Sequence, residues 1–332
     1  MEIEDITSAD RRKLLKLPIL AGLVGALPIE AAAQEQKADP LLTARPMPTV
    51  DARFPAEMAP GVFILPDKRI PLVPNIGIVV GTQAALVVDC GLGIDSAENV
   101  LRLTRELAPG RRIILTVTHA HPEHGFGAQV FRNDAHIYYN AAQRDYLMRS
   151  GNGMLDGFSA SVLPPAHRHL LDGIELTPPH ETYDGSEAAF DLGGREVRLR
   201  TWGTAHSPGD QIVFLPQERI LFAGDLLEER MFPIVPFFPP MIGADDIDVA
   251  KWEVALNGIL RLQPRLIVPG HGNLGGTEIP EAVLGYFKAV SNILAQTGQQ
   301  NRDLRPLIRA RYPTWENPEF IPPALAYFRL RA

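Results

Sequence analysis

The segment Thr118-His119-Ala120-His121-Pro122-Glu123-His124-Gly125 decides how this chain is interpreted, because three histidines and one glutamate fall within six residues. It follows residues 113–117, an almost wholly apolar run that is typical of a buried strand. Imidazole nitrogen and carboxylate oxygen are the ligands that zinc and other divalent metals take in proteins. A solvated histidine-rich turn is the alternative, but nine histidines among 332 residues make such a cluster improbable by chance. The segment therefore predicts a metal centre at a strand end.

Three later segments repeat the pattern of an apolar run that leads to a metal-ligand residue. They present His206, Asp225 and His271, each beside or near glycine. Each is weak alone, since a histidine beside glycine is more often a hydrogen-bonded turn residue and an aspartate after glycine is usually a cap. Their order after the first cluster makes the combined signal specific.

The first segment and the three later ones together resemble the motif of the metallo-β-lactamase superfamily. That motif is His-x-His-x-Asp-His, then a histidine in a Ser/Thr-Pro-Gly turn, then Gly-Asp, then Gly-His. The resemblance extends over about residues 61–272. It implies an α/β fold of layered α and β elements, the αββα four-layer sandwich, with a dinuclear metal site at one edge. It also implies a first metal held by His119, His121 and His206, a second held by Glu123, His124 and His271, and a bridging Asp225, while Asp89 matches a structural aspartate of the family.

Glu123 departs from the family pattern, which has aspartate at this position. The extra methylene lengthens the side chain by about 1.5 Å. The charge and the hard oxygen ligand are kept. We therefore expect an altered second metal position in preference to lost activity.

A dinuclear site of this kind predicts hydrolysis. Two divalent ions can share a water, lower its pKa toward neutrality and supply a hydroxide nucleophile, while one of them polarises a carbonyl oxygen. Glu123 or Asp225 is the catalytic carboxylate expected to accept the water's proton. We expect two divalent ions, zinc first with iron or manganese as alternatives, and a small-molecule substrate with a lactone, β-lactam or related ester or amide bond.

Two other functions remain open at this point. One is an iron-dependent redox enzyme similar to the persulfide dioxygenases of the same fold, because histidine and carboxylate sites also suit iron. The other is a metal-binding or partner-binding protein in which Glu123 has impaired catalysis. The formal net charge of −7 argues against a nucleic-acid partner. Cys90 is the one cysteine, which excludes an intrachain disulfide and a cysteine-rich metal site, and we interpret it as a small buried apolar residue.

The chain begins with a segment typical of an export signal. Residues 1–33 carry the pair Arg11-Arg12, a short apolar run and the sequence Ala31-Ala32-Ala33, which resembles a bacterial twin-arginine signal. We expect export to the periplasm and no stable membrane anchor after processing. Residues 34–60, polar and proline-rich, are predicted to form an extended arm outside the core, and residues 61–332 to form the domain, with a C-terminal helical stretch. A homo-oligomer is left open.

Periodicity predicts the remaining elements. Asp95 to Glu98 is expected to open a helix as a capping box, and residues 151–181 are expected to form a long loop. The histidines of that loop, His167, His169 and His180, are interpreted as solvated, with a further metal or substrate contact as the alternative.

Residues 232–240, apolar and stiffened by prolines, are a candidate wall of a substrate pocket. The candidates for fixing the ligand imidazoles are Thr118, Thr204, Ser207 and Asp210. Short apolar runs predict strands at 61–65, 75–80, 85–89, 113–117, 135–139, 189–191, 197–202, 211–215, 220–223 and 266–268, and helical periodicity predicts helices at 141–148, from residue 248, and at 280–295.

Overall fold

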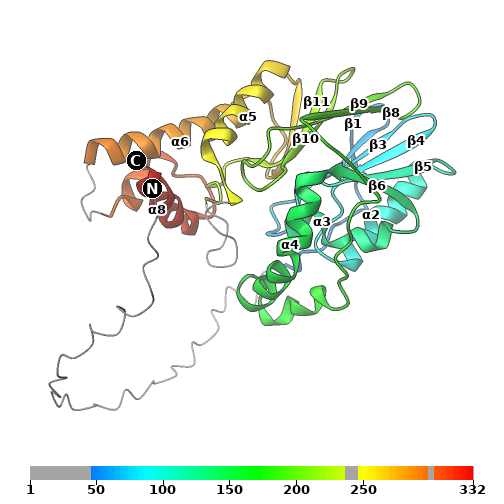
Figure 1. Cartoon of the computed structure of the whole chain (residues 1–332), viewed down its shortest axis with the longest axis horizontal. Coiled ribbons are helices and arrows are strands. Elements are labelled where there is room, and N and C mark those ends of the chain that lie inside the picture. Colours follow the sequence, from blue (N-terminus) through cyan, green and yellow to red (C-terminus); the bar gives the residue numbers. More distant parts are fainter. Residues whose placement is uncertain (1–45, 236–245, 298–302, 332) are drawn as a thin grey trace, which may run out of the picture. The chain divides into compact units, whose positions relative to one another are not determined.

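The structure is a computed structural model that describes residues 46–235, 246–297 and 303–331. The expected export signal and the first part of the expected arm lie outside the described residues. The described part forms two β-sheets with helices (Figure 1). The layers follow the order helices, sheet, sheet, helices (αββα) that the resemblance implies, so the predicted fold class is confirmed.

The first sheet has seven strands in the order β1-β2-β3-β4-β5-β6-β7. Strands β1 to β4 form an antiparallel meander, and β4 to β7 pair in parallel. Their bounds are β1 Ala56–Ala59, β2 Val62–Leu65, β3 Ile76–Val80, β4 Ala84–Val88, β5 Arg112–Thr116, β6 Ala135–Asn140 and β7 Glu181–Tyr183.

The second sheet has five strands in the order β12-β11-β10-β9-β8. All of its neighbours are antiparallel except β11 and β12, which are parallel. Strands β8 and β9 form a hairpin, and the Asp191 carboxylate accepts hydrogen bonds from the backbone N–H groups of Gly193 and Gly194 in its turn. The bounds are β8 Glu187–Asp191, β9 Glu196–Thr201, β10 Gln211–Leu215, β11 Ile220–Glu228 and β12 Leu266–His271.

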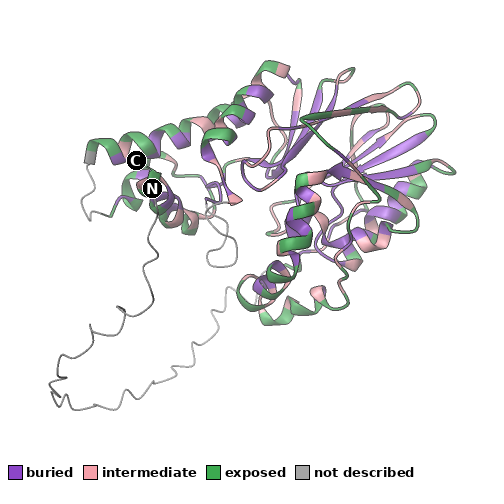
Figure 2. Cartoon of the chain, in the orientation of Figure 1, coloured by how far each residue is buried: buried purple, intermediate pink, exposed green. Residues whose placement is uncertain are grey.

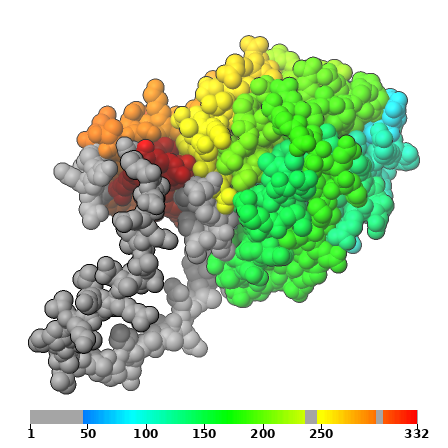
Figure 3. All heavy atoms as spheres, viewed as in Figure 1, coloured from blue at the N-terminus to red at the C-terminus, as the bar shows by residue number. Residues whose placement is uncertain are grey.

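Helices cover the outer faces of both sheets, and α2, α5 and α6 pack through an apolar stripe. Helix α2 (Ile94–Leu107) packs on the first sheet, whereas α5 (Val249–Leu262) and α6 (Glu278–Thr297) belong to the core on the second. The C-terminal segment folds back onto α6 (Figures 1 and 3). The remaining elements are α3 Pro122–Gly125, η2 Phe126–Phe131, α4 Ala141–Gly157, η3 Phe158–Val162, η4 Pro165–Leu171, α7 Arg305–Arg311, η6 Pro318–Phe320 and α8 Ile321–Arg331.

The core divides into three clusters that match the layers. One lies between the two sheets, where Ile64 and Leu86 of the first sheet join Leu199 and Phe222 of the second. The others lie between each sheet and its helices. Figure 2 shows the strands mostly buried and the helices buried along one side. Because both faces of the central strands are covered, these strands read as nearly continuous apolar runs.

Three predictions about local structure are wrong. Helix α2 begins at Ile94 after Gly93, without a side-chain cap, so Asp95 lies in its first turn and forms no capping box. The expected loop 151–181 is largely helical, because α4 continues to Gly157 and η3 and η4 follow. Gly151 permits this continuation by packing closely on Leu176, a tertiary contact that outweighs the low helix propensity of glycine.

The third difference concerns the expected arm, as far as the structure describes it. Val50 and Ala52 are buried in the core beneath the first sheet. Ala56–Ala59 forms the edge strand β1. The expectation that this stretch lies outside the core is therefore wrong, since apolar residues between the prolines add to the domain. Separately, a helix long and apolar enough to cross a bilayer does not occur among the described residues.

Replacing Gly77 by alanine should destabilise the packing of the two sheets. A Cβ at this position in β3 would lie 2.3 Å from a ring carbon of the buried Phe222. Overpacking of this kind costs about 1–3 kcal/mol, to be measured as the loss of unfolding free energy in urea. The control is Gly153→Ala, an exposed position in α4 where a Cβ meets nothing within 4 Å, which should gain up to about 1 kcal/mol. Equal stabilities for Gly77→Ala and the parent would contradict this account of the interface.

Candidate metal centre

Loops and strand ends from both sheets bring the predicted ligand residues to one site. His119, His121, Glu123 and His124 follow β5, with Pro122 at the first position of the short helix α3. His206 lies between β9 and β10, and His271 is the last residue of β12. Asp225 lies inside β11 and not after its end as expected, because a bulge around Gly224 lets the strand continue to Glu228.

The seven residues form two groups, each suited to hold a metal ion. The first group is His119, His121, His206 and Asp225, and the second is Glu123, His124, Asp225 and His271. Within each group one ligand atom per residue lies within 4.8 Å of the others, and all seven residues are buried. The grouping is the one that the resemblance implies.

The first group gathers three imidazoles around a common point. His121 Nδ1 lies 3.0 Å from His119 Nε2 and 3.1 Å from His206 Nε2. Burial lowers the pKa of His119 and His121 well below the ordinary value and that of His206 to about 4. The imidazoles are therefore neutral at neutral pH, which is the form that binds a metal.

Asp225 links the two groups through its two carboxylate oxygens. Oδ2 lies 3.6 Å from His119 Nε2 and 3.9 Å from His206 Nε2. Oδ1 lies 3.2 Å from His124 Nε2 and 3.7 Å from His271 Nε2. Burial alone would raise the pKa of Asp225, but the surrounding His124, His271 and His119 outweigh it and hold the pKa well below its usual value. One ionised carboxylate thus faces both groups.

The second group accommodates the longer Glu123. Burial raises the pKa of this carboxyl group, and Asp225 adds to the effect. Burial opposes protonation of His124, but Asp225 and Asp89 outweigh it and hold the pKa of this imidazole well above its usual value. In the metal-free protein a proton on His124 therefore balances part of the negative charge of Asp225 and Asp89.

The buried polar atoms of the second group show that these residues fit a metal. Within the described residues, Glu123 Oε2 has no hydrogen-bond partner, and His124 Nε2 and Asp225 Oδ1 face each other at 3.2 Å. Buried polar atoms are rarely left unpaired, because each costs about 1–3 kcal/mol. A cation at this point would satisfy all three.

Asp89 is the main support of the ligand loop. Its carboxylate accepts the Thr118 backbone N–H at 2.7 Å, the Thr118 hydroxyl at 2.9 Å and lies 2.9 Å from His124 Nδ1. It does so from a left-handed backbone conformation, with φ of +65°, that is uncommon for a residue other than glycine. The carboxylate fixes the ring of His124 so that Nε2 faces Asp225.

The predicted supports of the imidazoles are only partly correct. Thr118 Oγ1 lies 3.2 Å from His119 Nδ1, as expected. Ser207 and Asp210 bond to each other, with the hydroxyl 2.6 Å from the carboxylate, and Thr204 lines a different pocket. His271 Nδ1 lies 3.1 Å from the Val73 carbonyl oxygen, a backbone contact that side-chain patterns do not reveal.

A pocket of about 270 Å³ opens beside the second group. Glu123 and His271 line it, and so does Glu228, a buried residue near the end of β11 that the sequence analysis missed. Burial raises the pKa of Glu228 well above the usual value, and Asp225 and Glu123 add to this. Its position three residues after Asp225 could have indicated a role at the site, but in the sequence Glu228 cannot be distinguished from an ordinary strand residue.

Of the other residues singled out in the sequence, some line this pocket and others lie away from it. His167 lines the pocket, whereas His169 contacts the Ala166 carbonyl oxygen and His180 accepts the backbone N–H of Ile137. Cys90 is buried, as expected, and burial raises its thiol pKa well above the usual value.

The apolar stretch 232–240 is described only to residue 235. Within it Ile234 lines the pocket. Phe232 instead packs in the core against Tyr286 and Trp315.

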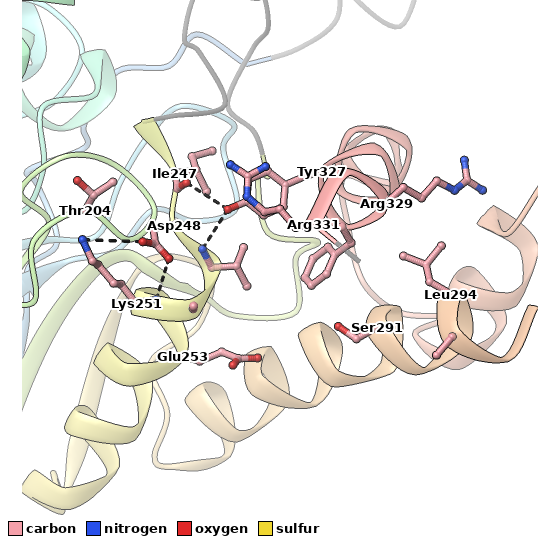
Figure 4. Close-up of a pocket in the computed structure, with 14 residues that line it drawn as sticks. Thr204, Ile247, Asp248, Lys251, Glu253, Ser291, Leu294, Tyr327, Arg329 and Arg331 are labelled. Atoms are coloured by element: carbon pink, nitrogen blue, oxygen red, sulfur yellow. Dashed lines mark hydrogen bonds and ion pairs between the residues drawn. The ribbon is translucent and has the colours of Figure 1, made fainter. Parts of the chain in front are cut away.

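A larger pocket of about 960 Å³ lies elsewhere, between α5, α6 and α8 (Figure 4). Its wall includes the Tyr327 hydroxyl, which donates to the Ile247 carbonyl oxygen, and Asp248, which caps the start of α5 through the Lys251 N–H. Neither metal group contributes a lining residue to it. The smaller pocket is therefore the candidate substrate site.

The fold and the site define a two-sheet αββα protein with paired histidine–carboxylate groups at the edge where the sheets meet. A model of the metallo-β-lactamase superfamily matches residues 69–271, and the chain belongs to this superfamily.

Similar proteins support this assignment. The acyl-coenzyme A thioesterase MBLAC2 of Gallus gallus is 27% identical over 68% of this chain and 79% of that protein. The metallo-beta-lactamase type 2 of Bacteroides fragilis is 31% identical over 31% of this chain and 39% of that protein. Two solved structures share the fold. A metallo-beta-lactamase from Pontibacter korlensis has a TM-score of 0.53 at 17% identity, covering 70% of this chain and 97% of its own, and the DIM-1 metallo-beta-lactamase has 0.54 at 16%, covering 72% and 97%.

Proposed function

We propose that the protein is a dinuclear, zinc-dependent hydrolase of acyl bonds in a small molecule: a lactone, a β-lactam or a related ester, thioester or amide. The observation that carries the proposal is the position of Asp225, whose two carboxylate oxygens face the two histidine groups separately. His119, His121 and His206 would hold one ion, Glu123, His124 and His271 the other, and Asp225 both. When bound, such ions acidify water and polarise a carbonyl oxygen.

The chain's own residues would supply orientation and proton transfer. Glu123 and Asp225 are the carboxylates positioned to take the proton of the attacking water. Asp89 and Thr118 keep His124 and His119 turned toward the site. The apolar pocket walls, which include Leu72, Ile234 and Phe320, would hold the acyl group and exclude water.

The relatives favour acyl transfer to water over the redox alternative, because the names of both curated relatives describe hydrolases. Export to the periplasm remains part of the proposal and depends on the signal-like residues 1–33. Expression of the full chain in bacteria, followed by fractionation and determination of the mature N-terminus, tests it. An intact N-terminus in the cytoplasm would contradict export.

The hydrolase proposal is tested by metal analysis together with a substrate panel. Protein purified without added metal should contain close to two zinc ions per chain, and fully loaded protein should hydrolyse at least one class among aryl esters, lactones, thioesters and β-lactams. No hydrolysis of any class at full loading would reject the proposal. Iron as the sole native metal, with oxygen consumption, would favour the redox enzyme.

A further inference from the structure

The pocket beside the second metal group has an apolar wall and an acidic polar lining. Besides Glu123 and Glu228, the carboxylates that line it are Asp67, Glu316 and Glu319. Its cationic or basic lining residues, among those described, are Arg69 and His167. Arg69 is held by ion pairs to Glu229 and to Glu316, the latter at 2.8 Å. The guanidinium is thus already paired with two carboxylates of the protein.

Glu228 and Asp67 are the buried members of this acidic lining that the proposed chemistry does not use, and Asp67 is satisfied by the backbone N–H groups of Arg69 and Gly272. Glu228 is the last residue of β11, three positions after Asp225, and its backbone lies beside His271 of β12. The residue is 5% exposed and belongs to neither group of metal-ligand residues. Within the described part of the chain, Glu228 Oε2 has no hydrogen-bond partner.

A buried carboxyl oxygen without a partner points to a ligand that supplies the missing donor. Leaving such a group unpaired is costly, so each buried unpaired group in a native protein calls for a partner or a role. The donor must come from within the pocket, because Glu228 lines it next to Glu123 and His271. An amide N–H, a hydroxyl or an ammonium group fits this requirement, whereas a substrate carboxylate adds a second acceptor to a site already crowded with carboxyl groups.

We propose that Glu228 is a substrate-specificity residue: its carboxyl group accepts a hydrogen bond from a neutral or cationic donor close to the scissile carbonyl and disfavours substrates with a carboxylate there. This inference rests on the proposed hydrolase function. The substrate class is an acyl compound with an apolar body, which packs against the pocket wall, and an N–H, O–H or ammonium donor near the reacting carbon. The selection is expected to differ from that of a pocket with a free arginine or lysine.

The test uses three 4-nitrophenyl esters that differ at one position: the butanoate, without a donor, the 3-aminopropanoate, with an ammonium group, and the hydrogen succinate, with a carboxylate. The wild-type protein at full metal loading should give the highest kcat/KM for the ammonium ester and the lowest for the succinate, with a ratio of about 10- to 100-fold between them. In Glu228→Gln the kcat/KM values of the ammonium ester and the succinate should both approach that of the butanoate, so their ratio should fall toward 1. Spontaneous hydrolysis is subtracted for each ester.

Glu98→Gln is the control, since it removes a carboxylate at an exposed position of α2 that does not line this pocket. It should leave the ratio unchanged. Dissociation constants of the corresponding 4-nitroanilides, measured by calorimetry on the same proteins, should show the same order without any turnover. If none of the esters is hydrolysed, the proposed function fails, and the anilide ratio alone decides the role of Glu228. An unchanged ratio in Glu228→Gln, or loss of bound metal in that variant, would overturn the inference.

Discussion

Replacing Asp225 by asparagine is expected to lower kcat/KM for the best acyl substrate by roughly 10²- to 10⁴-fold and to reduce the bound metal from two ions per chain to one or fewer. The carboxylate faces His119 and His206 with one oxygen and His124 and His271 with the other, and all of these groups are buried. Removing one charged partner from a buried cluster costs about 3–5 kcal/mol, and each 1.36 kcal/mol corresponds to a tenfold change.

The measurements are metal content by elemental analysis and steady-state kinetics on the same samples. Asp303→Asn is the matched control, because Asp303 forms an ion pair with Arg305 at an exposed position, where such pairs contribute little. Its metal content and rate should equal those of the parent. An Asp225→Asn protein that keeps two ions and full activity would show that the two histidine groups do not depend on a shared carboxylate.

The ligand residues could be predicted from the sequence because their chemistry is local. Three histidines after one strand need no knowledge of the rest of the fold, and His206 and His271 follow the same rule at later strands. Which ligands meet was implied by the resemblance to the metallo-β-lactamase superfamily and not by local pattern, because each group joins residues that belong to or follow strands of two different sheets.

Glu228 and several contacts were missed because they depend on tertiary structure. Glu228 reads as one glutamate in an apolar strand, and only its burial beside the second metal group distinguishes it from a solvent-facing residue. The contact between Asp89 and His124 joins residues 35 positions apart and has no local pattern. The helical continuation of α4 through Gly151 likewise depends on Leu176, which packs on it from a distant part of the chain.

Removing the metals should lower the melting temperature by roughly 10 °C as well as abolish hydrolysis. Ligands that bind only the folded state stabilise it by about 4 kcal/mol when present at a thousandfold excess over their dissociation constant, and each kcal/mol moves the midpoint of a domain of this size by about 2–4 °C. Chelation would leave the buried Glu123 Oε2 without a partner and Asp225 Oδ1 with the neighbouring imidazoles alone. Scanning calorimetry of chelated and zinc-reloaded protein measures the difference, with reloading as the control for irreversible damage.

The difference in melting temperature should widen as the pH rises from 6 to 8. Asp225 and Asp89 overcome the effect of burial and raise the pKa of His124 in the metal-free protein. A raised folded-state pKa contributes stability that is complete below the unfolded value of about 6.5 and is lost as the pH rises through the folded value. The chelated protein therefore loses this contribution toward alkaline pH, while the metal competes with fewer protons for His124 Nε2 and binds more tightly. A difference that narrows toward pH 8 would mean that the proton on His124 does not replace the metal, and that the two groups of ligands are stabilised in some other way.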